Sequence, residues 1–360
     1  MLTDSRGAGR FLAALIAATV WVGWLSSPVR ATSLPGGWIE MRSEHFILVT
    51  DARPRKAKKV LGHLEQFRGL MSDALPVFAD ISAPPLRVFA ARNLASFRVL
   101  APNYGRTAGN VRVAGFFASE PGSEVIVLNE LSGAADYGTI YHEYFHFLSS
   151  YANLELPPWL EEGLADYWGA GTELTSREAK VGKPLGMRLG FLDDGRKLLP
   201  LDAFFMADRT SPFYQAEKQA GLFYAQSWAM VHMMLLGDET GAMREQLGRY
   251  MVLTMRGVES LEAARATFGD LDVLQRKLRS YSRQPTFRYA KMPLPPETDP
   301  KSFKFRELSR GEAAALIAGH LMAVRPTKDA AALVEIALEE APDLPMTSYA
   351  LGLVERDRRR

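Results

Sequence analysis

The sequence predicts an α+β protein, with a small mixed β-sheet and a covering helix first, a helical part next and a short α-helical extension last. Short runs rich in β-branched and aromatic residues, separated by Pro, Gly and Asn, fill the chain up to about residue 129. Beyond that point apolar residues recur at helical spacing. With 360 residues, of which 47% are hydrophobic, the chain can bury one large core or two smaller ones.

The first half is predicted to contain four strand-forming segments and one helix. Residues 38–50, WIEMRSEHFILVT, end in the apolar run of a strand, and residues 53–75 follow as a helix. Apolar side chains at helical spacing indicate that helix: Val60, Leu64, Phe67 and Met71. Three further strand-like runs follow: PLRVFAA, VRVAGFFAS and SEVIVLN.

The second half is predicted to be helical. Its predicted helices cover residues 137–151, a segment that begins at Pro157 and Pro158, and residues 222–236, 243–255 and 271–281. Residues 169–215 are rich in Gly, Lys, Asp and Pro and have weak periodicity. We therefore expect loops with short elements there, of the kind that flank a cleft.

A Pro-rich segment, residues 284–300, is expected to be a linker to the C-terminal extension, residues 301–360. Three short Ala-rich helical runs lie in that extension, at residues 311–324, 329–341 and 346–357. Their spacing resembles tetratricopeptide-like helical pairs that could bind a protein partner, and a plain helical cap is the alternative. The domain expected before the linker covers residues 32–283.

The N-terminus has the order of a secretory signal peptide. Arg6 and Arg10 precede an apolar run from Phe11 to Leu25, and cleavage is expected after Ala31. Residues 1–31 therefore predict export to the periplasm or to the outside of the cell. The alternative is a retained membrane anchor, although the apolar run is shorter than the ~20 residues of a spanning helix.

Composition excludes several classes of protein and of site. Removing residues 1–31 takes away three basic residues and one acidic residue, which leaves 40 of each. A neutral chain that ends in the short basic run RDRRR does not predict a nucleic-acid partner. The absence of cysteine excludes disulfides, thiolate ligands and a cysteine nucleophile. A metal site would therefore use His, Asp and Glu.

The segment YHEYFHFLSS, residues 141–150, predicts such a site. On a helix, His142 and His146 lie one above the other and present two imidazoles to one point. Glu143 directly follows His142 on the same helix. From there it can reach a water bound to the same metal and act as a general base. With only 6 histidines in the chain, this spacing is more specific than most short motifs.

A third metal ligand is expected in the segment LPPWLEEGLADYW. If a helix begins at its prolines, Glu162 and Asp166 lie one turn apart on one stripe. Glu162 could then bind the metal, and Asp166 could accept the free ring N–H of a ligand histidine. Glu161 is the competing ligand, about 100° round the helix, and spacing alone does not decide between the two glutamates.

HEYFH followed by WLEEGLADY resembles the thermolysin-like gluzincins of the peptidase MA clan, which implies a zincin-like domain. In that clan the third zinc ligand is the glutamate before glycine in a W-L-x-E-G-x-A pattern, which implies Glu162 as the ligand. LFYAQSWAMVHMML resembles a helix of the clan's aminopeptidase branch whose tyrosine stabilises the oxyanion, which implies Tyr224. The resemblance covers residues 38–283 and extends to exported bacterial members of the clan. The sequence lacks the G-A-M-E-N motif of the aminopeptidases.

The resemblance implies an exported zinc metallopeptidase that cleaves a peptide or protein substrate. Zn²⁺ held by His142, His146 and Glu162 would activate a water, Glu143 would be the general base, and Tyr224 would donate to the oxyanion. The alternative is a non-catalytic peptide- or protein-binding module that keeps the fold and the metal. A purely structural zinc site is a third hypothesis, although such a site needs no general base.

Overall fold

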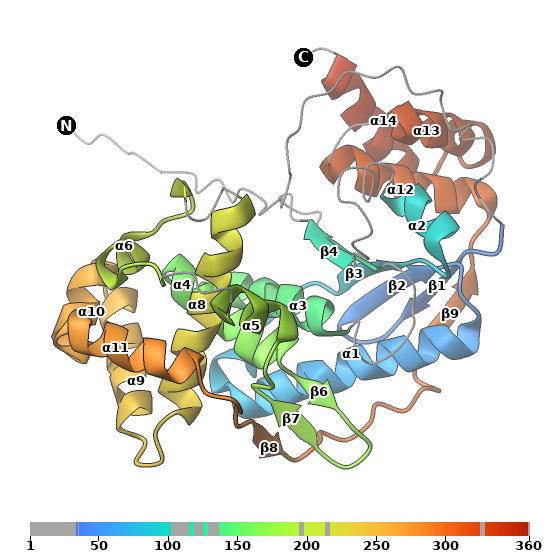
Figure 1. Ribbon diagram of the computed structural model, residues 1–360. Coiled ribbons are helices and arrows are strands. Elements are labelled where there is room, and N and C mark those ends of the chain that lie inside the picture. The colour runs from blue at the N-terminus through green and yellow to red at the C-terminus, as the bar shows by residue number, and fades with distance from the viewer. Residues whose placement is uncertain are drawn as a thin grey trace, which may run out of the picture. The chain divides into compact units, whose positions relative to one another are not determined.

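The structure is a computed structural model, and it describes residue 34 and residues 36–101, 115–118, 125–128, 137–193, 198–212, 217–324 and 328–358 (Figure 1). The chain divides into two compact units: unit 1 is Met1–Gly62, Pro84–Ser132 and Asp299–Arg360, and unit 2 is His63–Ala83 and Gly133–Thr298. Helices and strands are both present, which confirms the mixed α+β class. The predicted signal peptide, residues 1–31, lies outside the described residues.

Unit 1 contains a six-stranded mixed sheet in the order β4-β5-β3-β2-β1-β9. Its strands are β1 (Ile39–Arg42), β2 (Phe46–Thr50), β3 (Leu86–Ala90), β4 (Gly115–Ala118), β5 (Val125–Leu128) and β9 (Lys304–Glu307). The three central strands β2, β3 and β5 are parallel, and the others pair antiparallel. The segment in which we predicted one strand holds two, because the Ser43 amide bonds the Phe46 carbonyl at 3.0 Å and closes a β1–β2 hairpin.

One face of this sheet shares a hydrophobic core with four helices. Val49, Phe89 and Val127 are register partners on β2, β3 and β5, and all three are fully buried. They belong to the same buried cluster as apolar residues of the helices α2 (Leu94–Leu100), α12 (Arg310–Val324), α13 (Lys328–Glu340) and α14 (Pro345–Arg358). The helices α2, α12, α13 and α14 thus lie on the same side of the sheet (Figure 1).

The predicted separation of the C-terminal helices from the sheet is wrong. Strand β9 pairs with β1, with Phe305 opposite Met41, so residues 304–307 complete the sheet. Helix α12 is buried along a continuous run, Ala313 to Ala318, in the core that it shares with the sheet. The three helices therefore belong to unit 1 rather than to a separate extension.

The Pro-rich segment is not a free linker. Within it, β8 (Ala290–Met292) joins a three-stranded sheet of unit 2 in the order β6-β7-β8. The side-chain amide of Gln66 donates to the carbonyl of Pro295 at 3.3 Å. A Cβ added at Gly69 would lie 2.9 Å from Cβ of Pro295, so the two backbones approach closely. Residues 284–298 therefore pack within unit 2.

Unit 2 is mainly helical, as expected. Its long helices are α3 (Tyr137–Tyr151), α8 (Glu217–Leu236), α9 (Ala242–Met255), α10 (Ser260–Phe268) and α11 (Leu271–Ser282), and the units divide inside α1 (Pro54–Ala74). The weakly patterned segment holds the short elements that we predicted: β6 (Glu173–Leu174), β7 (Ala179–Val181), α5 (Gly186–Asp193) and α6 (Leu201–Met206). In the described part of the chain, no helix combines the length and the apolar character that crossing a membrane requires.

Candidate metal centre

Helix α3 places two histidines side by side because its other faces are needed for the core. Tyr141, Tyr144 and Phe145 are buried, and the ring of Tyr141 stacks on Phe67 with the centroids 3.8 Å apart. His142 and His146, four residues apart, remain on a partly exposed stripe with their ring centroids 4.8 Å apart. The two histidines therefore share the one face of α3 that the core does not use.

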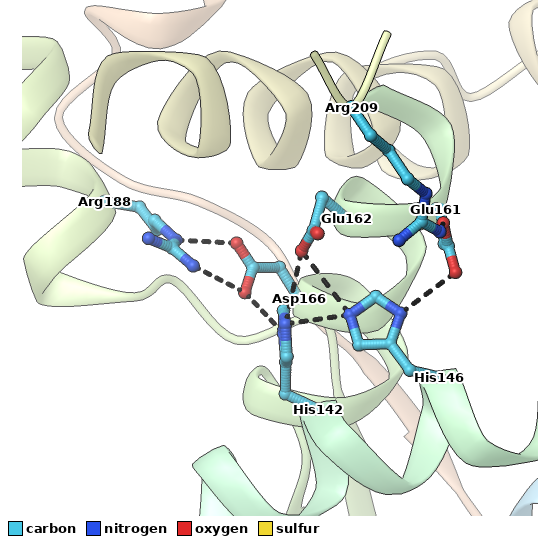
Figure 2. A network of polar contacts seen from close by, with 7 residues as sticks. All are labelled: His142, His146, Glu161, Glu162, Asp166, Arg188 and Arg209. Atoms are coloured by element: carbon cyan, nitrogen blue, oxygen red, sulfur yellow. Dashed lines mark hydrogen bonds and ion pairs between the residues drawn. The ribbon is translucent and has the colours of Figure 1, made fainter. Parts of the chain in front are cut away.

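Helix α4 (Pro158–Leu164) brings a glutamate pair against that stripe. The helix begins with Pro158, whose fixed φ suits the first helical position, and buries Trp159 and Leu160 completely. The indole of Trp159 donates to the hydroxyl of Tyr250 at 2.9 Å, which fixes the rotation of α4 about its axis. Glu162 is then buried and points toward the histidines (Figure 2).

Three ligand atoms converge on one point. Nε2 of His142 lies 3.2 Å from Nε2 of His146, and Oε2 of Glu162 lies 3.3 Å and 3.4 Å from these two nitrogens. Three ligands of a tetrahedral zinc with bonds of about 2.0–2.1 Å lie about 3.3–3.4 Å apart. Within the described residues, this is the one group of histidine and acidic side chains close enough to share a metal. The donor set and its spacing therefore fit zinc.

Asp166 orients the first histidine. It lies in η3 (Ala165–Ala170), a π-helical turn that continues α4, and its Oδ1 lies 3.0 Å from Nδ1 of His142. A carboxylate accepts the proton on Nδ1, so the lone pair of His142 is on Nε2, toward the convergence point. Arg188 of α5 holds the other side of this carboxylate through two hydrogen bonds, of 2.6 Å and 3.1 Å.

Glu161, the competing ligand, does not reach the convergence point. Its Oε1 lies 3.2 Å from Nδ1 of His146, and Nη2 of Arg209 donates to its Oε2 at 2.5 Å. Glu161 therefore accepts the Nδ1 proton of His146, as Asp166 accepts that of His142. Both neutral imidazoles then carry their proton on Nδ1. The structure thus separates two adjacent glutamates that sequence spacing left equivalent, with Glu162 at the ligand point.

The pKa values of these groups show that the site favours a cation. Burial opposes charge on His142, but its hydrogen bonds to Asp166 and Glu162 outweigh burial and raise its pKa to about 9. The pKa of His146 is likewise raised, against the effect of burial, by the charge of Glu162. Burial would raise the pKa of Glu162, but the charge of His146 lowers it well below its ordinary value.

The charge count leads to the same conclusion. Four carboxylates and two guanidiniums belong to the network or interact electrostatically with it: Glu143, Glu161, Glu162, Asp166, Arg188 and Arg209. With neutral imidazoles their net charge is two negative, which equals the charge that one divalent cation would neutralise.

Glu143, the expected general base, is partly buried on α3 next to His142. Burial raises the pKa of its carboxyl above the ordinary value, while the two nearby histidines oppose that shift. No hydrogen bond to Glu143 is among those that the structure gives for the described residues. Glu143 is therefore outside the ligand triangle and interacts electrostatically with all three of its members.

Two glycines allow the three helices to approach. A Cβ at Gly163 would lie 2.5 Å from the carbonyl oxygen of Ser227 on α8. A Cβ at Gly169 would lie 2.5 Å from the backbone nitrogen of His142. Real Cβ contacts are not this short, so glycine after Glu162 and in η3 is what lets the ligand segment pack directly on α3 and α8. Gly163, which follows Glu162 in the sequence, therefore has a packing role.

Tyr224 lies at the border of this network. It is partly exposed on α8, and Cζ of Arg188 lies 5.0 Å from the centroid of its ring. His232, eight residues further along α8, is buried, with Nδ1 2.7 Å from the Tyr281 hydroxyl and Nε2 2.8 Å from the Gly182 carbonyl. It is thus a packed histidine outside the network of Figure 2.

Sequence reasoning missed both arginines. Arg188 and Arg209 lie in the weakly patterned segment, 22 and 48 residues from the carboxylates that they bind. No local spacing links residues that far apart, so the sequence offered only basic residues in a segment expected to flank a cleft.

Comparison with known proteins identifies no family. No family model, curated protein or solved structure matches the chain. The resemblance to the gluzincins therefore rests on the quoted motif segments, and the geometry above is what now supports a functional assignment.

Proposed function

We propose that this protein is a zinc metallopeptidase with a zincin-like catalytic domain, exported as its N-terminal sequence predicts. The convergence of His142 Nε2, His146 Nε2 and Glu162 Oε2 at mutual distances of 3.2–3.4 Å carries this proposal. Two imidazoles and a carboxylate are the ligand set of the thermolysin type of catalytic zinc site, which keeps a fourth position for water or substrate.

Zinc bound there would supply a water whose pKa lies near 7 and a Lewis acid for the scissile carbonyl. The protein's own groups then divide the proton transfers between them. Glu143, adjacent in sequence to a ligand histidine and not tied into the ligand network, accepts a proton as the carbonyl is attacked. The same carboxyl then returns the proton to the leaving amine. Asp166 and Glu161 keep the two imidazoles in the tautomer that binds metal.

The intact general base favours catalysis over a purely structural zinc. A closed structural site uses four protein ligands, whereas the group found in the described residues supplies three. A peptide is the substrate that the motif resemblance favours. The binding-module hypothesis remains the outcome if zinc binds and no peptide is cut.

Residues 32–360 are expected to cut members of a quenched-fluorescent peptide library with random sequences. Chelation with 1,10-phenanthroline should abolish cleavage, and added Zn²⁺ should restore it, because the metal supplies the activated water. The measurement is fluorescence release, followed by mass spectrometry of the products to locate the cleaved bonds. Stoichiometric zinc without cleavage of any library member would contradict a peptidase and favour the binding module.

Tyr224→Phe is expected to lower kcat by roughly 10²-fold with little change in KM, because an oxyanion donor acts in the transition state. Phenylalanine keeps the ring over Arg188 and removes only the hydroxyl. Zinc content should not change. Tyr289→Phe, a change on a tyrosine that is 39% exposed, is the control and should retain full activity. Full kcat in Tyr224→Phe would remove this residue from the mechanism.

A further inference from the structure

The two ligand histidines are held by similar chains of contacts that differ in burial. On the His142 side, the carboxylate of Asp166 is 1% exposed and the guanidinium side chain of Arg188 is 18% exposed. Arg188 approaches with two donors, Nε at 2.6 Å from Oδ2 and Nη2 at 3.1 Å from Oδ1. Such a two-point contact leaves the carboxylate one orientation.

On the His146 side the corresponding pair is more open. Glu161 is 12% exposed, and the side chain of Arg209 is 49% exposed. Nη2 of Arg209 donates to this carboxylate at 2.5 Å. Water screens and competes for an exposed pair, so Arg209 constrains Glu161 much less than Arg188 constrains Asp166.

We infer that Arg188 is a positioning residue of the metal centre, which acts on His142 through Asp166 and makes the His142 side the rigid half of the site. Asp166 Oδ1 receives both the Arg188 donor and the His142 Nδ1 contact, at 3.1 Å and 3.0 Å, so the orientation of one bond sets that of the other. The inference rests on the proposed function, because it presupposes a metal at the convergence point.

Arg188 also connects the metal centre to the proposed oxyanion donor. Its guanidinium lies over the ring of Tyr224, with Cζ 5.0 Å from the ring centroid, and thus contacts α8 while it binds η3. The guanidinium is planar, so it can stack on an aromatic ring and donate two hydrogen bonds to one carboxylate. The ammonium group of lysine can do neither. Replacement by lysine should therefore restore only part of its effect.

The test compares Arg188→Gln with Arg209→Gln, its matched control on the other histidine. Cobalt(II) is titrated into the metal-free full chain and followed by its d–d absorption, and zinc affinity is measured by competition with a chromophoric chelator. We expect Arg188→Gln to weaken metal binding by about 10–100-fold. Arg209→Gln should weaken it by no more than about fivefold, as for other exposed pairs.

A double-variant cycle separates positioning through Asp166 from a general structural role. If Arg188 acts through Asp166, then Arg188→Gln added to Asp166→Asn should cause no further loss of affinity. Arg188→Lys should bind metal with intermediate affinity, because a lysine can donate to one carboxylate oxygen but cannot form the fork. Arg188→Lys also decides the question if Arg188→Gln fails to fold.

Parent-like affinity in Arg188→Gln and Arg188→Lys would overturn the inference. So would an equal loss in Arg209→Gln, or additive losses in the cycle with Asp166→Asn. Failure of the parent chain to bind metal would overturn the proposed function as well. Metal binding that depends on Arg188 in a chain that cuts no peptide would contradict the peptidase and leave this inference standing.

Discussion

Glu143→Gln is expected to lower kcat/KM for peptide cleavage by about 10²–10⁴-fold, the contribution typical of a general acid–base. The amide keeps the size of the side chain and loses the ability to accept and return a proton. Zinc content should stay at the parent level, because Glu143 is not among the three converging side chains. Initial rates on a cleaved library peptide and elemental analysis of the same sample are the two measurements.

The matched control is Glu155→Gln, which makes the same chemical change at an exposed position between α3 and α4. It should leave both the rate and the zinc content unchanged. Peptide cleavage at the parent rate by Glu143→Gln would show that another group transfers the proton, and loss of zinc would mean that Glu143 supports the metal rather than the chemistry.

Glu162→Gln is expected to lose zinc, whereas Glu161→Gln should keep it with an affinity reduced by about 10–100-fold at most. The two neighbours have identical side chains and differ in position: Oε2 of Glu162 lies 3.3 Å from Nε2 of His142, and Oε1 of Glu161 lies 3.2 Å from Nδ1 of His146. An amide oxygen is a weak zinc ligand, so the loss falls on the residue that binds directly. Competition with a chelator gives both affinities.

His146→Ala accompanies this pair as the reference for a missing ligand. It should resemble Glu162→Gln in zinc affinity, because each removes one of three protein ligands. Circular dichroism establishes that each variant is folded. Retention of zinc by Glu162→Gln together with loss from Glu161→Gln would exchange the roles that the structure gives to the two glutamates.

Helices with a strong local signal in the sequence were predictable. Helix α3 was predicted at residues 137–151, where the structure has it, because its buried stripe repeats at helical spacing. The helix that begins at Pro157 and Pro158 was predicted from these prolines, and its apolar residues Leu160 and Leu164 are buried. Strong periodicity and proline both act within a few residues, so a sequence displays them directly.

The organisation of the units was not predictable in the same way. Strand β9 has the sequence KFRE, is exposed at every position, and finds its partner β1 more than 260 residues earlier in the chain. Nothing in four exposed residues specifies such a distant edge. The prolines of residues 284–300 predict a linker, although Gln66 of α1 donates to the carbonyl of Pro295 in this segment.

In the candidate metal centre, too, local spacings were predictable and contacts between distant segments were not. Spacing predicted that His142 and His146 share a face and that Glu162 and Asp166 lie one turn apart, and the structure brings these four side chains into one network. Spacing did not separate Glu161 from Glu162, because that choice depends on how α4 is rotated by contacts such as Trp159 with Tyr250. Side-chain packing between distant helices decided it.

The most direct test of the central claim is anomalous X-ray diffraction from crystals of residues 32–360, with data collected on both sides of the zinc absorption edge. We expect one zinc peak per chain, within bonding distance of His142 Nε2, His146 Nε2 and a Glu162 carboxylate oxygen, and no bond to Glu161. A zinc peak elsewhere, a peak bonded to Glu161, or no peak in crystals grown with added Zn²⁺ would contradict the metal centre and the function derived from it.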